Sequence, residues 1–197
     1  MQRVYKKQKV NLNKENHYGG EDMAEALKAM YNKEFLHSFG EKVHTVHDTF
    51  DTERFVSTAM DDGWDVLELK ARMRRITQTL RRYLPIEYVE ALDVLFAIDE
   101  SCIGFPYLFF PDFVAEYGLE KEHWELSMNA LERFTQRSTS EFAIRAFIIL
   151  DPERVMCQMT IWSKHQNEHV RRLATRDPAR ACHGVWGFPC LSVTQLL

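Results

Sequence analysis

Glu141 is an acidic residue that follows Ser140 at the predicted start of a helix, within a stretch rich in arginine. A carboxylate at the rim of a basic groove would be a functional arrangement, because aligned arginines suit phosphates spaced along a strand. The arginines that could form this groove are Arg133, Arg137, Arg145, Arg171 and Arg172. Two ordinary alternatives stay open: the pair Ser140–Glu141 could only complement a helix dipole, and the arginines could form a solvated face.

A second basic run, LKARMRRITQTLRRYL, alternates its cations with an apolar stripe. The pattern is typical both of an exposed helix face and of a helix that contacts a DNA backbone, and the sequence leaves the two open. The cations of this run are Lys70, Arg72, Arg74, Arg75, Arg81 and Arg82.

Other kinds of site find little support. His165 and His169 have the spacing of a helical metal pair, but Asn167 is expected to break the helix between them and no third ligand is near. The four cysteines are scattered without a CxxC pair, and no Gly-rich phosphate loop or Ser-His-Asp arrangement occurs. We therefore expect no metal site and no cofactor.

The elements that must position these groups are helices almost throughout. Apolar residues recur at three- and four-residue steps from Met23 to Phe39 and again from Val66 to Tyr83, before Pro85. FPYLFFPDF is expected to be a short helix with an aromatic entry, because its prolines disfavour a strand. Further helices are predicted after an Asp51 cap, over 86–98, 121–136 and 140–149, and from Asp151-Pro152 to His165.

Two similar segments suggest a repeat. SEFAIRA from Ser140 and NEHVRRL from Asn167 share a capping residue, a Glu, a small apolar fourth residue and an Arg in sixth place. Together with the helical periodicity they favour stacked helix pairs of the HEAT type over a four-helix bundle. The predicted fold class is all-α, a partial right-handed α-solenoid of HEAT-like helical repeats, with Arg145 and Arg172 in corresponding places on its concave side.

Composition bounds the class of protein. The 197 residues are 45% hydrophobic and 27% charged, which is ordinary for a soluble domain with a real core. No stretch approaches the ~20 apolar residues that span a bilayer, and no apolar segment follows the basic N-terminus, so we expect a cytoplasmic protein with no membrane partner. The net charge of -4 requires any DNA binding to depend on a local basic surface.

WELSMNALERFTQRSTSEFAIRAFI, followed by WSKHQNEHVRRLA, closely resembles the AlkC-type DNA alkylation repair proteins, a HEAT-like family of DNA glycosylases. The resemblance runs from about Met23 to Ala174 and includes MAEALKAMYNKEFL and GFPYLFFPDFVAEYGLE. One departure is Ala146, where the family pattern has Pro after the Ile-Arg; alanine need not harm the helix there.

The resemblance implies an enzyme that excises cationic N-alkylated bases such as 3-methyladenine from double-stranded DNA. Because alkylation makes the base a good leaving group, the protein mainly has to stabilise positive charge on the deoxyribose and place a water. By similarity Glu141 is the expected catalytic group, with Asp112 and Glu116 as candidates for a second acid. The implied DNA contacts are Arg137, Arg145, Arg171, Arg172 and Trp124, although for Trp124 a place in the core is the favoured interpretation. A helical-repeat scaffold without catalysis and an inactive truncated product are the alternatives.

Both ends depart from the family pattern. A permitted coding of Thr175 to Trp186, read in another frame, gives EGSRPRLPWGV, which is how family members continue; we therefore expect residues 175–197 to be a frameshifted tail. YGGEDM can be coded with a ribosome-binding sequence before Met23, so residues 1–22 are expected to be a disordered leader and 23–174 the repair domain. A monomer is expected, with self-association possible through an apolar face exposed at Val170 and Leu173.

Overall fold

The computed structural model describes residues 25, 26 and 28–175, and every regular element among them is a helix. The all-α prediction is therefore confirmed. None of the helices in this part of the chain is long and apolar enough to cross a membrane. The expected leader, residues 1–22, lies outside the described residues, as does the expected frameshifted tail apart from Thr175.

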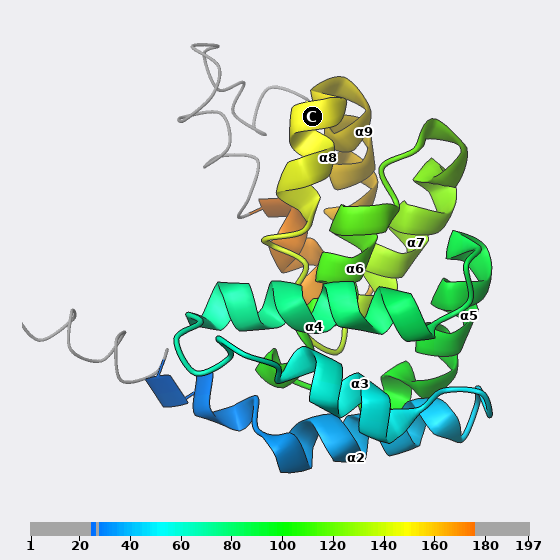
Figure 1. Ribbon diagram of the computed structural model, residues 1–197. Helices are drawn as coiled ribbons and strands as arrows, with labels where there is room; N and C mark the ends of the chain where they lie inside the picture. The colour runs from blue at the N-terminus through cyan, green and yellow to red at the C-terminus, as the bar shows by residue number, and fades with distance from the viewer. Residues whose placement is uncertain (1–24, 27, 176–197) are drawn as a thin grey trace, which may run out of the picture.

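Several helices pack against the next helix in the chain, whereas the helix over Leu69–Tyr83 packs mainly against the one over Phe109–Tyr117. Figure 1 shows α2 (Lys33–His44) and α3 (Thr52–Ala59) at one end of the molecule, α8 (Ile144–Leu150) and α9 (Pro152–Trp162) at the other, and α4 (Leu69–Tyr83) running across between them. The elements are α2 (Lys33–His44), α3 (Thr52–Ala59), α4 (Leu69–Tyr83), α5 (Tyr88–Ile98), α6 (Phe109–Tyr117), α7 (Trp124–Thr135), α8 (Ile144–Leu150) and α9 (Pro152–Trp162), with short 3-10 turns at Asp99–Ser101, Phe105–Tyr107 and Lys121–His123.

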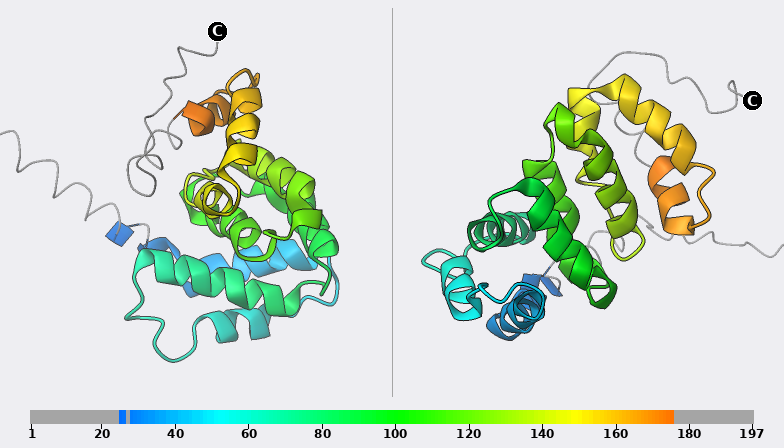
Figure 2. Two further views of the ribbon diagram at one scale, coloured as in Figure 1. Left: turned by 90° about the horizontal axis from the view of Figure 1, so that it is seen from above. Right: turned by 90° about the vertical axis from the view of Figure 1, so that its right-hand side faces the viewer.

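A last helical segment, residues 168–175, follows α9 after a turn. Figure 2 shows it running back alongside α9, as expected for the start of another helix pair. Asn167 caps this segment, since its side-chain oxygen accepts from the His169 backbone N–H at 2.9 Å. The predicted break between His165 and His169 is confirmed.

Polar side chains set several helix starts as predicted. The carboxylate of Asp51 accepts from the Arg54 N–H (3.0 Å) at the start of α3, and that of Asp151 accepts from the Arg154 N–H (3.1 Å) at the start of α9. One expectation needs correction: the apolar pattern from Met23 to Phe39 is not one helix. The chain breaks at Tyr31 and Asn32, because the Asn32 side chain caps a new helix by accepting from the Phe35 N–H at 2.8 Å.

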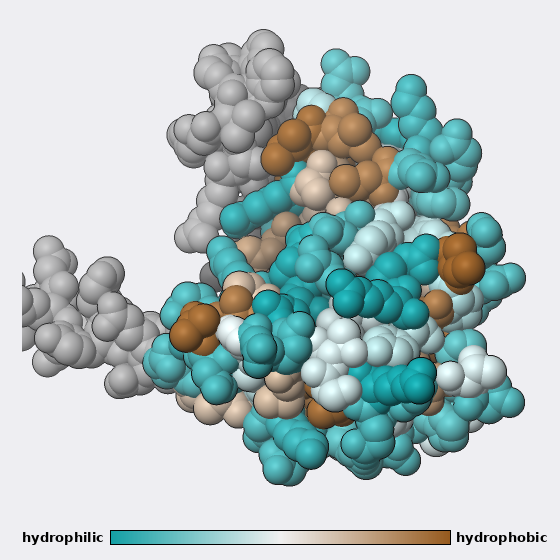
Figure 3. Space-filling view, viewed as in Figure 1, coloured by the Kyte–Doolittle hydropathy of each residue, from teal (hydrophilic) through white to brown (hydrophobic). Residues whose placement is uncertain are grey.

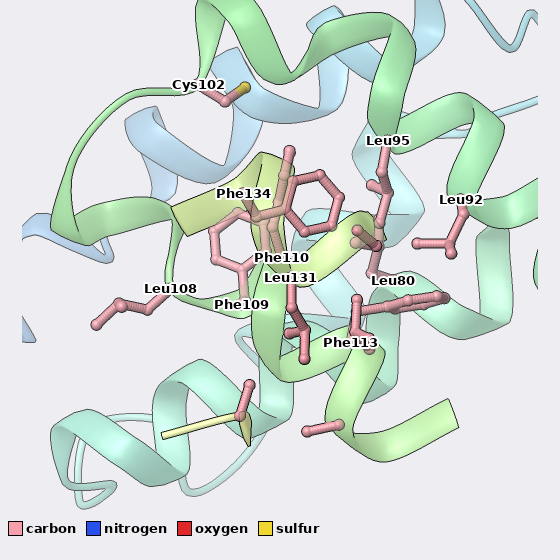
Figure 4. Packing of buried hydrophobic residues seen from close by; sticks show 14 of the residues in the cluster. Leu80, Leu92, Leu95, Cys102, Leu108, Phe109, Phe110, Phe113, Leu131 and Phe134 are labelled. Carbon is pink, nitrogen blue, oxygen red and sulfur yellow. The ribbon is translucent and has the colours of Figure 1, made fainter. Parts of the chain in front are cut away.

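The core is aromatic and centres on α6. This helix begins directly after the 3-10 turn Phe105–Tyr107, so the predicted short helix with an aromatic entry is confirmed. Rings continue from α2 through α6 to α7, with centroid separations of 4.9 Å for Phe39–Phe109 and 5.2 Å for Phe110–Phe134. Figure 4 shows Phe110 and Phe134 meeting within this core. α6 thereby joins the two ends of the molecule.

The apolar face expected at the C-terminal end is not where the sequence placed it. Val170 and Leu173 are both buried, so an exposed face at these two residues was wrong. The exposed apolar side chains in this region instead lie on α8 and α9, at Ile149, Leu150, Met156 and Ile161.

Candidate functional site

Glu141 lies on a turn that precedes α8, and a buried serine holds this turn in place. The Ser140 side chain donates to the Leu131 carbonyl of α7 at 2.9 Å, and the Ser140 N–H donates to the Thr135 hydroxyl at 2.8 Å. Ser140 therefore does not cap a helix beginning at residue 140, which the sequence suggests; α8 begins at Ile144 without a side-chain cap. Glu141 is half-buried on the resulting turn.

This turn directs its side chains both inward and outward. Ala143 and Ile144 are fully packed, whereas the ring of Phe142 is 45% exposed. Two cations lie over this ring: the Lys70 ammonium at the start of α4 is 4.7 Å from its centroid and the Arg145 guanidinium 5.5 Å. Both distances are within the range of a cation–π contact. We call Lys70, Glu141, Phe142 and Arg145 the α4–α8 surface.

The α4–α8 surface joins two elements that are distant in the sequence. Figure 1 shows the turn before α8 lying near the first residues of α4, and Figure 3 shows hydrophilic side chains gathered over α4. The surface thus combines two cations, an exposed ring and, one residue before that ring, the half-buried Glu141. The two cations can attract the phosphates of a nucleic acid to the turn that carries Glu141.

Asp112 and Glu116, the candidates for a second acid, lie on α6 and face α4. Arg74 of α4 bridges them: it is 2.8 Å from a carboxylate oxygen of Asp112 and forms an ion pair with Glu116. The second Asp112 oxygen accepts from the Thr77 hydroxyl at 2.8 Å. Burial raises the pKa of the Asp112 carboxyl, while the Thr77 hydrogen bond and the Arg74 charge act in the opposite direction. Both acids are thus occupied in joining α4 to α6.

The two acidic groups nevertheless border the same stretch of α4. Lys70 and Arg74 are four residues apart and so share one face of the helix. Lys70 contacts the ring beside Glu141, and Arg74 binds the two acids of α6. The structure therefore brings all three predicted acids to one region, in different environments.

The predicted phosphate contacts are not equivalent. Arg133 is bound to Asp99, with Nε–Oδ2 and Nη2–Oδ1 distances of 2.6 and 2.8 Å, and Arg137 lies 3.5 Å from a carboxylate oxygen of Glu100. Arg171 donates to the carbonyls of residues 165 and 166, which close the turn before its own helix. Arg145 and Arg172 are exposed, and only Arg145 belongs to the α4–α8 surface.

Trp124 lies in the core at the start of α7. It is 5% exposed and packs edge-on against the Phe147 ring, with 5.9 Å between centroids. The Arg154 guanidinium covers its outer side at 4.2 Å. Its position matches the core interpretation.

Most of the second basic run serves the fold, which the alternating pattern does not reveal. Arg72 is buried and donates to the carbonyls of Lys28 and Leu67, at 3.2 and 3.1 Å. Arg75 pairs with Asp61, and Arg81 donates to carbonyls in the turn after α4. Neither a plain exposed face nor a continuous DNA contact describes this helix. Lys70, in the first turn of the helix, is the cation of this run that belongs to the α4–α8 surface, through its contact with the Phe142 ring.

The part of the chain that the structure describes holds no group of three His, Cys, Asp or Glu side chains arranged for a metal ion. His165 instead lies 3.2 Å from Glu132 of α7, whose other oxygen accepts from the Trp162 indole N–H at 2.6 Å. These contacts fix α9 and the turn after it against α7.

Sequence reasoning missed the contact between Phe142 and Lys70. Each residue belongs to a segment with candidate site residues, but no spacing rule connects residues on two different helices. A phenylalanine directly after the candidate acid was the one available signal.

Comparison with known proteins places this geometry in context. The chain is 46% identical over 149 residues to the uncharacterized protein YhaZ of Bacillus subtilis (strain 168), a match that covers 76% of this chain and 41% of the relative. It is similar in fold to the alkylpurine DNA glycosylase AlkC of Pseudomonas fluorescens, solved bound to DNA containing an abasic site analogue, with a TM-score of 0.71 and 36% identity over 77% of this chain and 42% of that one. No family model matches.

Both matches support the resemblance to AlkC-type proteins inferred from the sequence, and it is confirmed at the level of sequence and fold. The helical-repeat fold is likewise that of AlkC. The chain spans about four tenths of the length of the proteins that it matches.

Proposed function

We propose that this chain acts in DNA alkylation repair, as a glycosylase that excises cationic N-alkylated bases such as 3-methyladenine from double-stranded DNA. The similarity to an alkylpurine DNA glycosylase supports the class of reaction. The observation that carries the proposal for this chain is the α4–α8 surface, where Glu141 lies beside a ring flanked by the cations of Lys70 and Arg145.

Cleavage of the glycosidic bond of an alkylated base requires mainly electrostatic stabilisation from the protein. An alkylated base carries a positive charge and leaves readily, so the glycosidic bond breaks with positive charge building on the deoxyribose. A fixed carboxylate next to that sugar stabilises the charge and can orient the attacking water. We assign this role to Glu141.

The other acids are assigned a supporting role. Asp112 and Glu116 are held by Arg74 between α4 and α6, so we propose that they position α4 and its Lys70 rather than act on the sugar. Lys70, Arg145 and Arg172 are the proposed phosphate contacts. Arg137 and Arg171 are proposed to stabilise the turns next to them, Arg137 through its ion pair with Glu100 and Arg171 through its hydrogen bond to the carbonyl of His165.

The test is release of 3-methyladenine from methylated duplex DNA, measured for the wild type and for Glu141→Gln. The proposal expects release by the wild type and a loss of about 100-fold or more in the variant, the usual scale for removing a preorganised charge-stabilising group. Salt-dependent DNA binding without base release would overturn the proposal and favour a non-catalytic scaffold.

A further inference from the structure

Phe142 is a large aromatic residue that the fold leaves on the surface beside the proposed catalytic carboxylate. It is 45% exposed, although the chain has an aromatic core in which Phe39, Phe109 and Phe134 are almost completely buried. Its neighbours Ala143 and Ile144 are buried at 3% and 0% exposure. The turn therefore points this one ring outward while it anchors the next two residues inside.

The ring is also held in place. Lys70 approaches it from α4 at 4.7 Å and Arg145 from α8 at 5.5 Å, and each cation–π contact restricts how the ring can lie. Cations over an exposed ring have a specific use at a polyanion, because phosphates can draw the charges off the ring face and so leave that face to contact a base or a sugar.

We propose that Phe142 is a positioning residue for damaged DNA: its ring stacks on a nucleobase or deoxyribose that is exposed where the duplex is distorted at the lesion. Apolar side chains that enter a base step unstack it, and base–aromatic stacking tolerates any sequence, as a repair protein requires. The inference rests on the proposed function, since it needs damaged duplex DNA on the α4–α8 surface. It assigns Phe142 an interaction that neither Glu141 nor the cations can make.

The experiment uses the whole chain and a duplex that carries 2-aminopurine next to an abasic-site analogue, because 2-aminopurine becomes brighter when it is unstacked. We expect wild-type protein to raise the fluorescence on binding and Phe142→Ala to lose most of that rise, with base release lowered by about tenfold. Phe142→Tyr keeps an aromatic face and should retain both properties. Phe142→Leu keeps an apolar side chain without that face and should behave like alanine.

Two measurements keep the outcomes apart. Thermal unfolding shows whether each variant is folded. Ile86→Ala is the matched control, because it removes an apolar side chain that is more exposed than Phe142 and lies beyond the far end of α4. This control should leave the 2-aminopurine fluorescence and the base release unchanged. Equal fluorescence and base release in the wild type, Phe142→Ala and Phe142→Leu would overturn the role of Phe142 alone. A wild type that neither binds the abasic duplex nor releases base would overturn the proposed function, and this inference with it.

Discussion

Two acidic groups border the first half of α4, and they differ in what surrounds them. Asp112 and Glu116 face the helix from α6 and are both bound by Arg74, with Asp112 buried and also bonded to Thr77. Glu141 lies on the turn before α8, half-buried beside an exposed ring that carries two cations. The first group joins two helices. The second lies on a turn whose next residue, Phe142, is exposed.

The difference shows that residue type is a poor guide to role in this chain. All three acids are candidates for the same chemistry by sequence, and the arginines around them look alike. Their positions separate them: the carboxylates of α6 bind Arg74, so moving them toward a substrate would break the bonds that hold α4 in place. Glu141 lies instead on a turn that Ser140 fixes to α7.

The largest effect on stability is expected from Arg74→Met, which leaves Asp112 buried without its cation. We expect the free energy of unfolding to fall by about 2 kcal/mol, less than for a fully buried pair because Arg74 is 37% exposed. Urea denaturation measures the change. Arg82→Met, an exposed arginine of the same helix, is the control and should change stability by less than ~0.5 kcal/mol. Equal stability of the two variants would mean that the Arg74 bridge does not hold α4 to α6.

A smaller loss is expected from Ser140→Ala, which removes the hydrogen bond from the turn to the Leu131 carbonyl. Since that carbonyl loses a buried partner, we expect a loss of about 1 kcal/mol in the free energy of unfolding. Base release per folded molecule should also fall, because the turn positions Glu141. A variant that loses stability but keeps full base release would show that the turn need not be held for catalysis.

A still smaller effect concerns the cations. Lys70→Ala and Arg145→Ala should each weaken binding to damaged and undamaged duplex DNA alike. If each cation neutralises one phosphate, each substitution should reduce the slope of log affinity against log salt by about 0.9. Filter binding or fluorescence anisotropy at several salt concentrations measures this. Arg82→Ala, at the other end of α4, should leave the slope unchanged; a slope that is equally unchanged in the first two variants would remove them from the DNA interface.

The smallest effect is a pH dependence. Burial raises the pKa of Asp112 in the folded protein above its ordinary value of 3.8, so the folded state binds this proton more tightly than the unfolded state does. The contribution of Asp112 to stability is therefore most favourable below about that pH and declines as the pH rises through the raised pKa. As the pH rises through this acidic range, the free energy of unfolding of the wild type should therefore fall relative to that of Asp112→Asn. A difference that grows in favour of the wild type as pH rises would contradict the burial effect.

The sequence was informative where a signal was local. The helices, the caps at Asp51, Asp151 and Asn167, and the aromatic entry to α6 all depend on residues within a few positions of one another. The sequence predicted a helix boundary less well where a polar side chain had two possible hydrogen-bond partners. Ser140 resembles a helix cap, but its hydroxyl bonds to α7, which shifts the start of α8 to Ile144.

The site shows the same limit more strongly. Glu141 is a candidate by the resemblance of its segment, whereas the contact of Lys70 with the adjacent ring of Phe142 depends on a different helix. The arginines of α4 have the pattern of a DNA-binding face, but their partners lie within the protein: Arg72 donates to the Lys28 carbonyl, which only the folded chain brings near. Periodicity records which residues share a face of a helix, and it does not record what packs against that face.

We propose that Glu141, and not the acids of α6, acts on the sugar. Single-turnover release of 3-methyladenine from methylated duplex DNA tests it directly, with wild type, Glu141→Gln and Glu116→Gln compared at equal fractions of folded protein. We expect Glu141→Gln to lower the rate by about 100-fold or more with unchanged DNA affinity, and Glu116→Gln to stay within a few-fold of the wild type. Equal rates for the wild type and Glu141→Gln, or an equally large loss in Glu116→Gln, would contradict it.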